Sequence, residues 1–304
     1  MKLKFQIIAF LITVLIPVLS HSQGCSDAGF CTVHSIKTTE SADSSYMGKN
    51  LIKTGISIGS AQYNVMIISP YIEYSRIINE KITTTIKMLY SVHYGDIATT
   101  QALSDVIATT NYKLSASVNL IGGIKIPLNA ADKSHNGLNL PMSYQTSLGT
   151  TDVIAGISYK KKNLSLTFAY QQPLTQNKNK FFIEDYPTDI INSNYKSTNS
   201  YVRKPDVLLR LSHNCNFKNK RMVLISSILP IYHIGDDSFV NKQNETQDII
   251  GSKGLTLNLN IFYQYKFSDS RTIEFSVGAP VVSREVRPDG LSQFALGVEY
   301  SITF

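Results

Sequence analysis

The sequence predicts an all-β protein, a transmembrane antiparallel up-and-down β-barrel of about 12 strands, with 14 as the alternative. Three observations predict it: an export signal, long segments of alternating apolar and polar residues, and connections that alternate between short turns and long polar loops. The chain is 43% hydrophobic and 17% charged, with 17 Tyr and 13 Phe. This composition excludes a disordered chain, which needs few aromatic residues and high charge.

The first segment, residues 1–22, has the features of a secretory signal peptide. Lys2 and Lys4 precede an apolar run from Phe5 to Leu19, and small residues follow at the expected cleavage site. An N-terminal membrane anchor is the alternative, but the run is shorter than the ~20 residues that span a bilayer. We expect cleavage after residue 22 and a location in the outer membrane of a Gram-negative bacterium. Because two lysines leave with the signal, the net charge of +7 no longer suggests nucleic acid.

The rest of the chain has no apolar stretch of ~18 residues, which excludes transmembrane helices. In segments 116–128, 255–267 and 292–304, apolar and polar residues instead alternate with a period of two. These segments exceed the ~5–6 residues of an ordinary soluble strand and reach the ~9–11 of a tilted membrane strand. The pattern therefore favours a membrane barrel over a soluble β-sandwich.

The connections between the predicted strands fall into two kinds. Every second one is a tight turn, as at 79–80, 113–115, 160–163, 217–220 and 267–271, whereas 129–149, 176–203 and 236–254 are long and polar. Outer-membrane barrels place short turns and both termini on the periplasmic side, with long loops outside. The predicted strands are 51–60, 67–79, 81–94, 104–114, 116–128, 150–161, 163–175, 204–217, 220–235, 255–267, 271–283 and 292–304.

Aromatic residues gather near the predicted strand ends, where membrane barrels carry girdles at the lipid interface. Ordinary β-propensity of aromatic residues is the alternative explanation. At the C-terminus, Tyr300 and Phe304 share the outward face, and this ending resembles the signal that the barrel assembly machinery recognises. The girdle candidates are Tyr90, Tyr94, Tyr112, Tyr159, Tyr170, Phe217, Tyr265, Phe267 and Phe304.

Charged residues occupy the predicted inward face, where a polar lumen tolerates them. They predict either a charged channel or binding lumen, or an ion-paired plug of side chains. A barrel of about 12 strands has room for more than side chains, since eight strands are only just filled. The lumen-lining candidates are Glu73, Lys87, His93, Asp105, Lys125, Asp152, Asp206, Arg210, Lys266, Glu274 and Glu299.

Four prolines, Pro127, Pro173, Pro230 and Pro280, stand toward the outer ends of four strands and on the predicted inward phase. Proline has no amide hydrogen to donate to the ladder, so each is a candidate strand kink. They are expected either to shape a constriction or a lateral gap for an apolar solute, or simply to end their strands.

The loop 176–203 contains large apolar residues, including Phe181, Phe182 and Tyr186. A purely solvated loop has no need of them. They predict an inward-folding cap, an apolar capture patch at the mouth, or packing onto the barrel rim.

Three short runs carry a family resemblance. LSDVIATTNYKL at 103–114, LIGGIKIPLN at 120–129 and TTDVIAGISYKKKNLSLTFAYQ at 150–171 resemble outer-membrane proteins of the meta-pathway phenol-degradation type, which are similar to the long-chain fatty acid transporter group. That family usually continues with Thr-Gly after the proline, where Leu128 and Asn129 stand here. The resemblance implies passage of small hydrophobic or aromatic solutes and transfers no binding residue.

Cys25 and Cys31 lie before the first strand, in the segment 23–50 that precedes the barrel at 51–304. A disulfide between them suits an oxidising compartment, with two free thiols as the alternative. The segment is expected either to plug the lumen or to lie in the periplasm. Cys215 remains unpaired, and with His213 it supplies two potential metal ligands where a site needs three or four, so no metal site is predicted.

Enzyme motifs are absent from the sequence: it has neither a nucleophile elbow nor a phosphate loop. His93 and Asp105 are a weak candidate dyad on neighbouring strands. We therefore expect no enzyme and no cofactor, but a channel that passes small, hydrophobic or aromatic solutes by passive diffusion. The alternatives are a barrel anchor whose loops bind a ligand or partner, and a lipid-acting hydrolase. Expected partners are outer-membrane lipids, the assembly machinery and a small apolar solute, with no nucleic acid.

Overall fold

The computed structural model describes residues 49–187, 191, 193–217, 221–290 and 294–304, and these form one closed antiparallel barrel of 12 strands. The predicted fold class is confirmed. Closure occurs between the first and last strands, where the amides of Asn50 and Phe304 each donate to the other's carbonyl oxygen at 2.9 Å. In chain order, the barrel strands are β1 (Asn50–Ser60), β2 (Met66–Ile77), β3 (Ile82–Tyr94), β4 (Thr99–Lys113), β5 (Val118–Pro127), β8 (Asp152–Lys161), β9 (Leu164–Pro173), β10 (Asp206–Phe217), β11 (Met222–His233), β14 (Gly254–Ser268), β15 (Arg271–Val282) and β16 (Phe294–Thr303).

The predicted strand positions agree with these bounds within a few residues, except at β4, which begins at Thr99 rather than at 104. A β-bulge explains the difference: the β3–β4 register shifts between Met88 and Tyr90. Opposite this shift, Ser104 and Asp105 are both buried although they are neighbours in sequence. The bulge therefore changes which residues face inward, so the alternation that marks β4 stops there.

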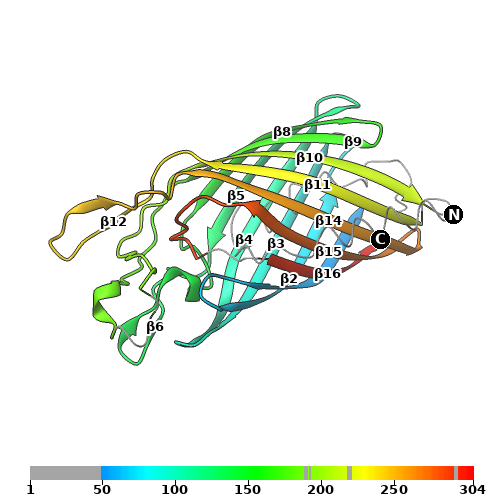
Figure 1. Ribbon diagram of the computed structural model, residues 1–304. Helices are drawn as coiled ribbons and strands as arrows, with labels where there is room; N and C mark the ends of the chain where they lie inside the picture. Colours follow the sequence, from blue (N-terminus) through cyan, green and yellow to red (C-terminus); the bar gives the residue numbers. More distant parts are fainter. Residues whose placement is uncertain (1–48, 188–190, 192, 218–220, 291–293) are drawn as a thin grey trace, which may run out of the picture.

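Short turns and the C-terminus lie at one end of the barrel, and long loops cover the other end (Figure 1). The connections at the loop end are L1 (61–65) and L2 (95–98), which are short, and L3 (128–151), L4 (174–205), L5 (234–253) and L6 (283–293, described to 290), which are long. They contain the small hairpins β6 (Ser134–His135) with β7 (Leu138–Asn139) and β12 (Ser238–Val240) with β13 (Thr246–Asp248), and the 3-10 turns η3 (Met142–Tyr144) and η4 (Ile183–Asp185). These elements are too short for their sequence pattern to predict them.

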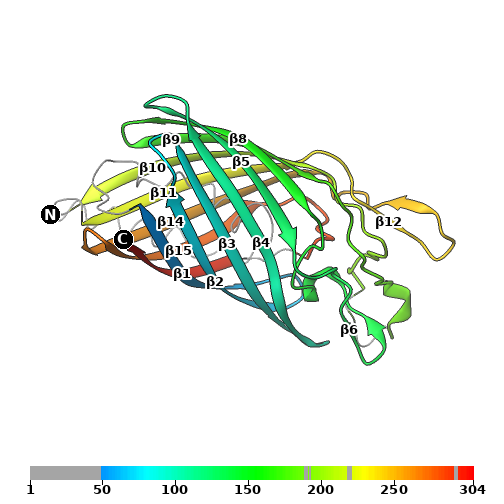
Figure 2. The same cartoon turned by 180° about the vertical axis from the view of Figure 1, so that it is seen from behind.

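Apolar side chains cover the outer wall of the barrel. Ile86 on β3, Ile157 on β8 and Leu211 on β10 are exposed by 49%, 44% and 45%. Figure 2 shows these three strands in the barrel wall. Such a surface suits lipid, because it would be costly to leave in water. Among the described residues, no helix has the length and apolar character to cross a membrane. The predicted outward direction of Tyr300 agrees with the structure, and Phe304 is 57% exposed.

A hydrophobic core lies among the loops, above the barrel wall. Its buried members come from L1 to L4 and the adjoining end of β2, so loops far apart in sequence pack as one layer. Burial of these rings and aliphatic groups stabilises the loop layer. The members are Ala61, Val65, Ile67, Ala98, Leu140, Tyr144, Phe181, Tyr186, Ile191 and Tyr195.

Candidate functional site

The predicted lumen candidates all lie on the inward phase of their strands, and all except Lys266 are buried. Apart from His93, Asp105 and Lys266, they contribute to two groups of charged and polar residues. One group lies within the barrel wall and is named the mid-barrel cluster: Lys53, Tyr71, Glu73, Lys87, Arg210, Gln264, Glu274 and Glu299. The other lies at the loop end and is named the mouth cluster: Lys125, Asp152, Tyr201, Arg203, Asp206, His233, Asp237, Arg284 and Asp289.

The mid-barrel cluster is centred on Lys53 of β1. Its Nζ atom lies 3.3 Å from Glu73 Oε1 on β2 and 3.5 Å from Glu299 Oε1 on β16. Both contacts follow from strand pairing, because β1 has β2 and β16 as neighbours and Lys53 is opposite Glu73. Gly55 leaves space for the ring of Tyr71, since a Cβ atom there would lie 2.6 Å from that ring. The Tyr71 hydroxyl donates to Glu299 Oε2 at 2.8 Å.

The same cluster continues along the wall in both directions. Lys87 Nζ lies 3.8 Å from the centroid of the Tyr71 ring, a cation–π contact. On the other side, Gln264 Nε2 donates to Glu274 Oε2 at 2.6 Å. Arg210 Nε donates to Ser227 Oγ at 3.0 Å. The lumen wall therefore carries both cationic and anionic groups, held by contacts between the side chains of nearby strands.

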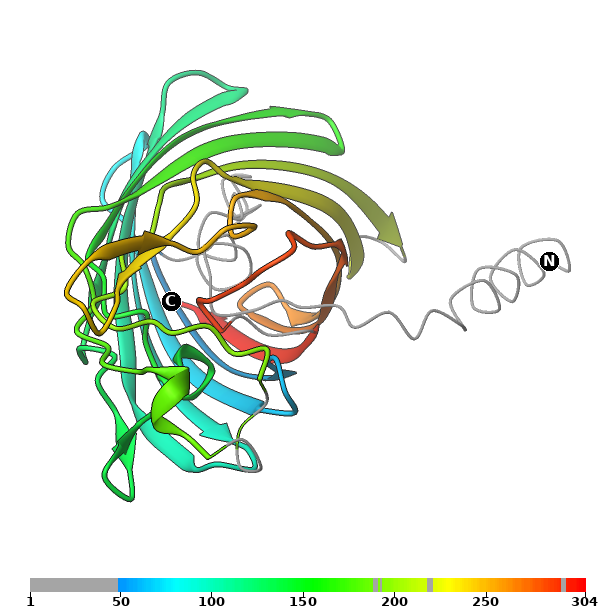
Figure 3. The same ribbon diagram turned by 60° about the vertical axis from the view of Figure 1, so that its left-hand side comes forward.

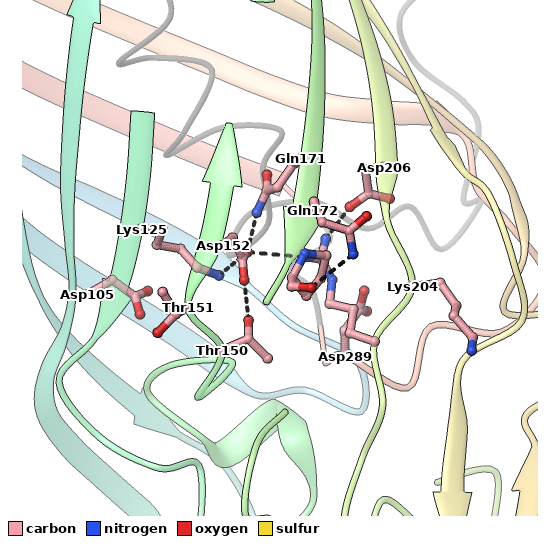
Figure 4. Close-up of polar contacts among 12 residues, drawn as sticks. Asp105, Lys125, Thr150, Thr151, Asp152, Gln171, Gln172, Lys204, Asp206 and Asp289 are labelled. Atoms are coloured by element: carbon pink, nitrogen blue, oxygen red, sulfur yellow. Dashed lines mark hydrogen bonds and ion pairs between the residues drawn. The ribbon is translucent and has the colours of Figure 1, made fainter. Parts of the chain in front are cut away.

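The mouth cluster begins at Asp152, the first residue of β8. Lys125 Nζ lies 2.7 Å from Asp152 Oδ2, and Thr150 Oγ1 donates to Asp152 Oδ1 at 2.6 Å. Gln171 also donates to this carboxylate, as Figure 4 shows. Arg203 of L4 lies 3.4 Å from Asp152 Oδ2 and pairs with Asp206 of β10. Arg203 thus ties L4 to two strands of the wall, β8 and β10.

His233, at the end of β11, joins the wall to L5. Its Nδ1 atom is 2.7 Å from Asp206 Oδ1 and its Nε2 atom is 2.7 Å from Asp237 Oδ1. A ring nitrogen that faces a carboxylate oxygen must donate, so the geometry fits the doubly protonated, cationic ring. The carboxylate of Asp237 also accepts from the Tyr201 hydroxyl at 2.6 Å and the Lys204 amide at 2.8 Å.

L6 completes the mouth cluster. Arg284 pairs with Asp289, donates from Nη1 to the Ser252 carbonyl oxygen at 2.8 Å, and lies 4.0 Å from Asp237 Oδ2. Figure 3 shows the chain after β15 running across the barrel opening. At the end of this segment, Gly290 has φ +72°, and a Cβ atom there would lie 2.3 Å from the Ser143 backbone nitrogen of L3. L6 therefore reaches from β15 to the loop between β5 and β8.

Two loop members of the mouth cluster, Asp237 and Arg284, are charged at neutral pH. Burial acts to raise the pKa of Asp237, but the hydrogen bond and charge of His233 and the charge of Arg284 hold this pKa below its usual value of 3.8. Burial opposes the charged form of Arg284, yet Asp289 and Asp237 raise its pKa above the ordinary value. Burial, and then the nearby charge of Asp237, raise the pKa of Tyr201 well above its usual value. Arg284 and Asp237 thus act as a permanent ion pair between L6 and L5.

Sequence analysis missed the loop members Tyr201, Arg203, Asp237, Arg284 and Asp289, because loops have no periodicity that tells which side chains turn inward. A local signal does exist. Arg203 and Asp206 are three residues apart, and His233 and Asp237 are four apart, each pair across the boundary of a strand. Oppositely charged residues three or four positions apart, on the two sides of a strand end, are therefore a sequence signal for loop residues that belong to the mouth cluster.

The four predicted kink prolines do not share one direction. Pro127 and Pro173 end their strands and face inward, and inward-facing Pro280 adjoins the β14–β15 register shift. Pro230 lies on the same face as Ile228 and Tyr232, which are 46% and 43% exposed, so its predicted inward direction is wrong. The neighbours of Pro230 explain this phase: Leu229 and Ile231 belong to a buried cluster inside the barrel.

Two outward prolines interrupt the strand ladder. Opposite Pro230, the β10–β11 pairing passes from Leu208 with Ile231 to Leu211 with Ile228. Pro70 of β2, which sequence analysis missed, accompanies the same kind of interruption against β3. Both follow from the missing amide hydrogen of proline.

The predicted mouth-loop residues have different surroundings. Phe181 is fully buried in the loop core and Tyr186 is 7% exposed, so neither belongs to a free apolar capture patch. Their rings contact each other, with centroids 5.6 Å apart. Phe182 is only partly buried and lies 5.4 Å below Lys242 Nζ. L4 therefore uses its apolar residues to pack against other loops.

His93 and Asp105 make their hydrogen bonds with other groups. His93 Nδ1 is 2.7 Å from the Ser143 carbonyl oxygen and Nε2 is 2.8 Å from Ser91 Oγ. Asp105 accepts from Ser147 at 2.6 Å and Ser104 at 3.1 Å. With both ring nitrogens of His93 engaged, the arrangement holds L3 against β3 rather than forming a His–Asp dyad.

The predicted disulfide between Cys25 and Cys31, and with it the segment up to residue 48, lies outside the described residues. Cys215 has a free thiol and lies on the lipid-facing side of β10. Its Sγ atom is 3.4 Å from His213 Nδ1. Within the described part of the chain, no group of three or more His, Cys, Asp or Glu residues is arranged to hold a metal ion.

Comparison with known proteins gives likeness in fold alone. No protein-family model matches the sequence, and no curated protein matches it either. Among solved structures, the translocator domain of the autotransporter NalP from Neisseria meningitidis has a TM-score of 0.51 at 10% identity, over 94% of this chain and 100% of that one. The porin NanC gives 0.45 at 10% identity (84% and 98%), and the toluene transporter TodX of Pseudomonas putida gives 0.43 at 11% identity (85% and 90%). The chain thus shares the architecture of outer-membrane barrels.

Proposed function

We propose that this protein is an outer-membrane channel of a Gram-negative bacterium, through which small solutes pass by passive diffusion when its loop-covered mouth opens. In this proposal the signal peptide is removed, the assembly machinery inserts the barrel, and lipid surrounds its apolar wall. The observation that supports it most is the mouth cluster. Its buried ion pairs fasten L4, L5 and L6 to the rim and to one another. A device that fastens loops over a lumen suits a channel with closed and open states.

The lumen chemistry bears on the solute. The mid-barrel cluster lines the wall with cationic and anionic side chains, and the mouth cluster adds further charges. A purely apolar solute moving along the axis would gain nothing from these groups and would displace their water. We therefore propose that the axial path takes small solutes that carry a charge or several polar groups, instead of the hydrophobic solutes implied by the family resemblance.

Reconstitution in planar bilayers tests the channel. The full chain is expected to give discrete conductance steps, larger and more frequent in an Asp237→Asn variant because the closed mouth loses one of its charges. The matched control is Asp248→Asn, an exposed residue of the L5 hairpin that lies outside the mouth cluster. A folded barrel that gives no conductance in either variant would contradict the channel and favour the anchor, whose protruding β12–β13 hairpin in L5 (Figure 1) would then be the first surface to test for a partner.

A second candidate is lateral exit of a small hydrophobic or aromatic solute through the wall. The ladder interruption opposite Pro230 favours it, since fewer hydrogen bonds hold β10 to β11 there. Liposome uptake of toluene tests this route. Pro230→Val is expected to slow uptake because valine restores the amide donor, while Pro127→Val at the end of β5 serves as the control. Equal uptake in the two variants counts against a lateral exit.

A further inference from the structure

A cavity of about 330 Å³ lies where four of the loops meet. L1 contributes Gln62 and Tyr63, L3 contributes 141–143, L4 contributes 194–196, and L6 contributes 285–288 and Gly290. A volume of about 300–1,000 Å³ is typical of small-molecule sites. The cavity therefore has the size for one small organic molecule.

The cavity has a buried floor and an exposed rim. Met142, Ser143, Tyr195 and Arg287 are each buried by more than nine-tenths. Lys196 and Glu285 stand exposed at the rim. A molecule that enters would meet a floor already held by packing, which lowers the entropy lost on binding.

Two aromatic rings form one side of the cavity. The centroids of Tyr63 and Tyr195 are 4.1 Å apart, with the planes inclined by 53°. Ser143 Oγ donates to the Tyr195 hydroxyl at 3.2 Å, which fixes that ring. Burial raises the pKa of both tyrosines, so their hydroxyls remain neutral and do not repel an anion. These faces suit a flat ring.

The charged residues around the cavity indicate which group the ligand carries in addition to its ring. Among the residues that line the cavity, Arg287 and Lys196 are cationic and Glu285 is the one carboxylate. The lining therefore carries a net positive charge, which favours an anion. We propose that this cavity binds a small organic anion with a planar ring, the ring against Tyr63 and Tyr195 and the carboxylate toward Arg287 and Lys196.

The site also adjoins the mouth cluster. Arg287 and Gly290 flank Asp289, the partner of Arg284, on the same loop. A bound anion would act on the loop that crosses the opening. As a capture site for a permeating solute the inference rests on the proposed channel function, although the binding itself does not.

Calorimetry on the full chain in detergent micelles tests the site with three probes. Benzoate carries both a ring and a carboxylate, benzyl alcohol carries the ring alone, and acetate the carboxylate alone. We expect benzoate to bind more tightly than either of the others. The inference is overturned if the folded protein does not bind benzoate, or if benzyl alcohol binds equally well.

Variants identify the two halves of the site. Tyr63→Ala is expected to weaken benzoate binding about fivefold, whereas Tyr63→Phe, which keeps the ring, leaves it unchanged. Arg287→Gln is expected to weaken it about tenfold or more. Because this variant could disturb L6, Lys196→Gln at the exposed rim provides the second measurement, with an expected loss of about two- to fivefold.

The matched control is Lys242→Gln on L5, a lysine outside the cavity that pairs with Asp185. Binding that is equal in Tyr63→Ala and Tyr63→Phe, or that Lys242→Gln weakens as much as Lys196→Gln, contradicts the assignment. Bilayer conductance without benzoate is measured separately. Benzoate binding without conductance would contradict the channel function and support the binding site. Conductance without benzoate binding would support the channel function and contradict the binding site.

Discussion

The mid-barrel cluster and the mouth cluster contain the same kinds of charged residues but are built differently. In the mid-barrel cluster, Lys53, Glu73 and Glu299 come from strands that pair directly, so the ladder sets their spacing. In the mouth cluster, Asp237 and Arg284 come from L5 and L6, and contact between them depends on how the loops fold. The mid-barrel cluster lies on a wall that backbone pairing already holds together. The mouth cluster itself holds L5 and L6 together.

This difference predicts different consequences when a charge is lost. In the proposed channel, removing a carboxylate from the wall changes the charge that a permeating ion meets, while the strands stay paired through their backbones. Removing Asp237 from the mouth leaves His233 and Arg284 each with one carboxylate partner fewer and loosens the loops. The predictions that follow test whether the two clusters separate in this way.

The largest expected effect is that of Asp237→Asn. The substitution leaves His233 and Arg284 facing a neutral amide, and losing one partner of a buried ion pair costs about 3–5 kcal/mol. We expect proteolysis within L4 and L5 to accelerate at least tenfold, with the barrel intact. Limited trypsin digestion followed by mass spectrometry measures it, and Asp248→Asn is the control. Cleavage at the wild-type rate would show that the ion pairs do not hold the loops.

The pH dependence of the mouth follows from the same residue. Because the pKa of Asp237 is lowered in the folded protein, its stabilising contribution is complete above the usual Asp value of 3.8 and is lost as the pH falls through the lowered pKa. Conductance of the wild type should therefore rise on acidification below about pH 4 and converge on that of Asp237→Asn. Since other carboxylates titrate there too, the difference between the two proteins is the quantity to follow. A difference that stays constant down to pH 3 contradicts the assignment.

A smaller effect is expected at Gly55 in the mid-barrel cluster. In Gly55→Ala the new Cβ atom would overlap the Tyr71 ring, which must move from Glu299. We expect a loss of about 1–2 kcal/mol in the free energy of unfolding, with loop proteolysis unchanged. Urea unfolding in liposomes measures it. Gly122→Ala on the lipid side, where a Cβ atom meets nothing within 4 Å, should stay within about 0.5 kcal/mol of the wild type.

The smallest effect is expected for Glu299→Gln. It removes one carboxylate from the lumen wall and should shift the permeability ratio toward anions by roughly two- to fivefold, as expected for a weak charge interaction of about 0.2–1 kcal/mol. Reversal potentials in a salt gradient measure the shift. Faster cleavage of L4 in this variant would mean that the two clusters are coupled, and the distinction drawn between them would fail.

The barrel itself was predictable because lipid on one side and a polar lumen on the other impose a period of two on every strand. That constraint placed Glu73, Lys125 and Arg210 on the correct face. The prediction from this period failed at two local irregularities, a β-bulge and a proline. The bulge at Ser104 and Asp105 hid the first residues of β4, and Pro230 was given the wrong phase although its buried neighbours show the right one.

The candidate site was predictable only in its wall half. Asp152 and Asp206 stand on strands and could be found, whereas Arg203, Asp237 and Arg284 stand in loops whose direction no pattern encodes. The aromatic residues of L4 show the same limit. Their number indicated packing, but nothing in the sequence told that Phe181 would be buried and Phe182 would not.

The contact between Gly290 and Ser143 has a mechanical consequence. Gly290 has φ +72°, and the backbone of Ser143 leaves no space for a side chain there. The backbones of L6 and L3 are therefore packed directly against each other. Almost any single-residue change at position 290 would hold the two loops apart without removing a charge. In the proposed channel, a substitution at Gly290 would therefore loosen the loop layer at the mouth while every charge of the mouth cluster stays in place.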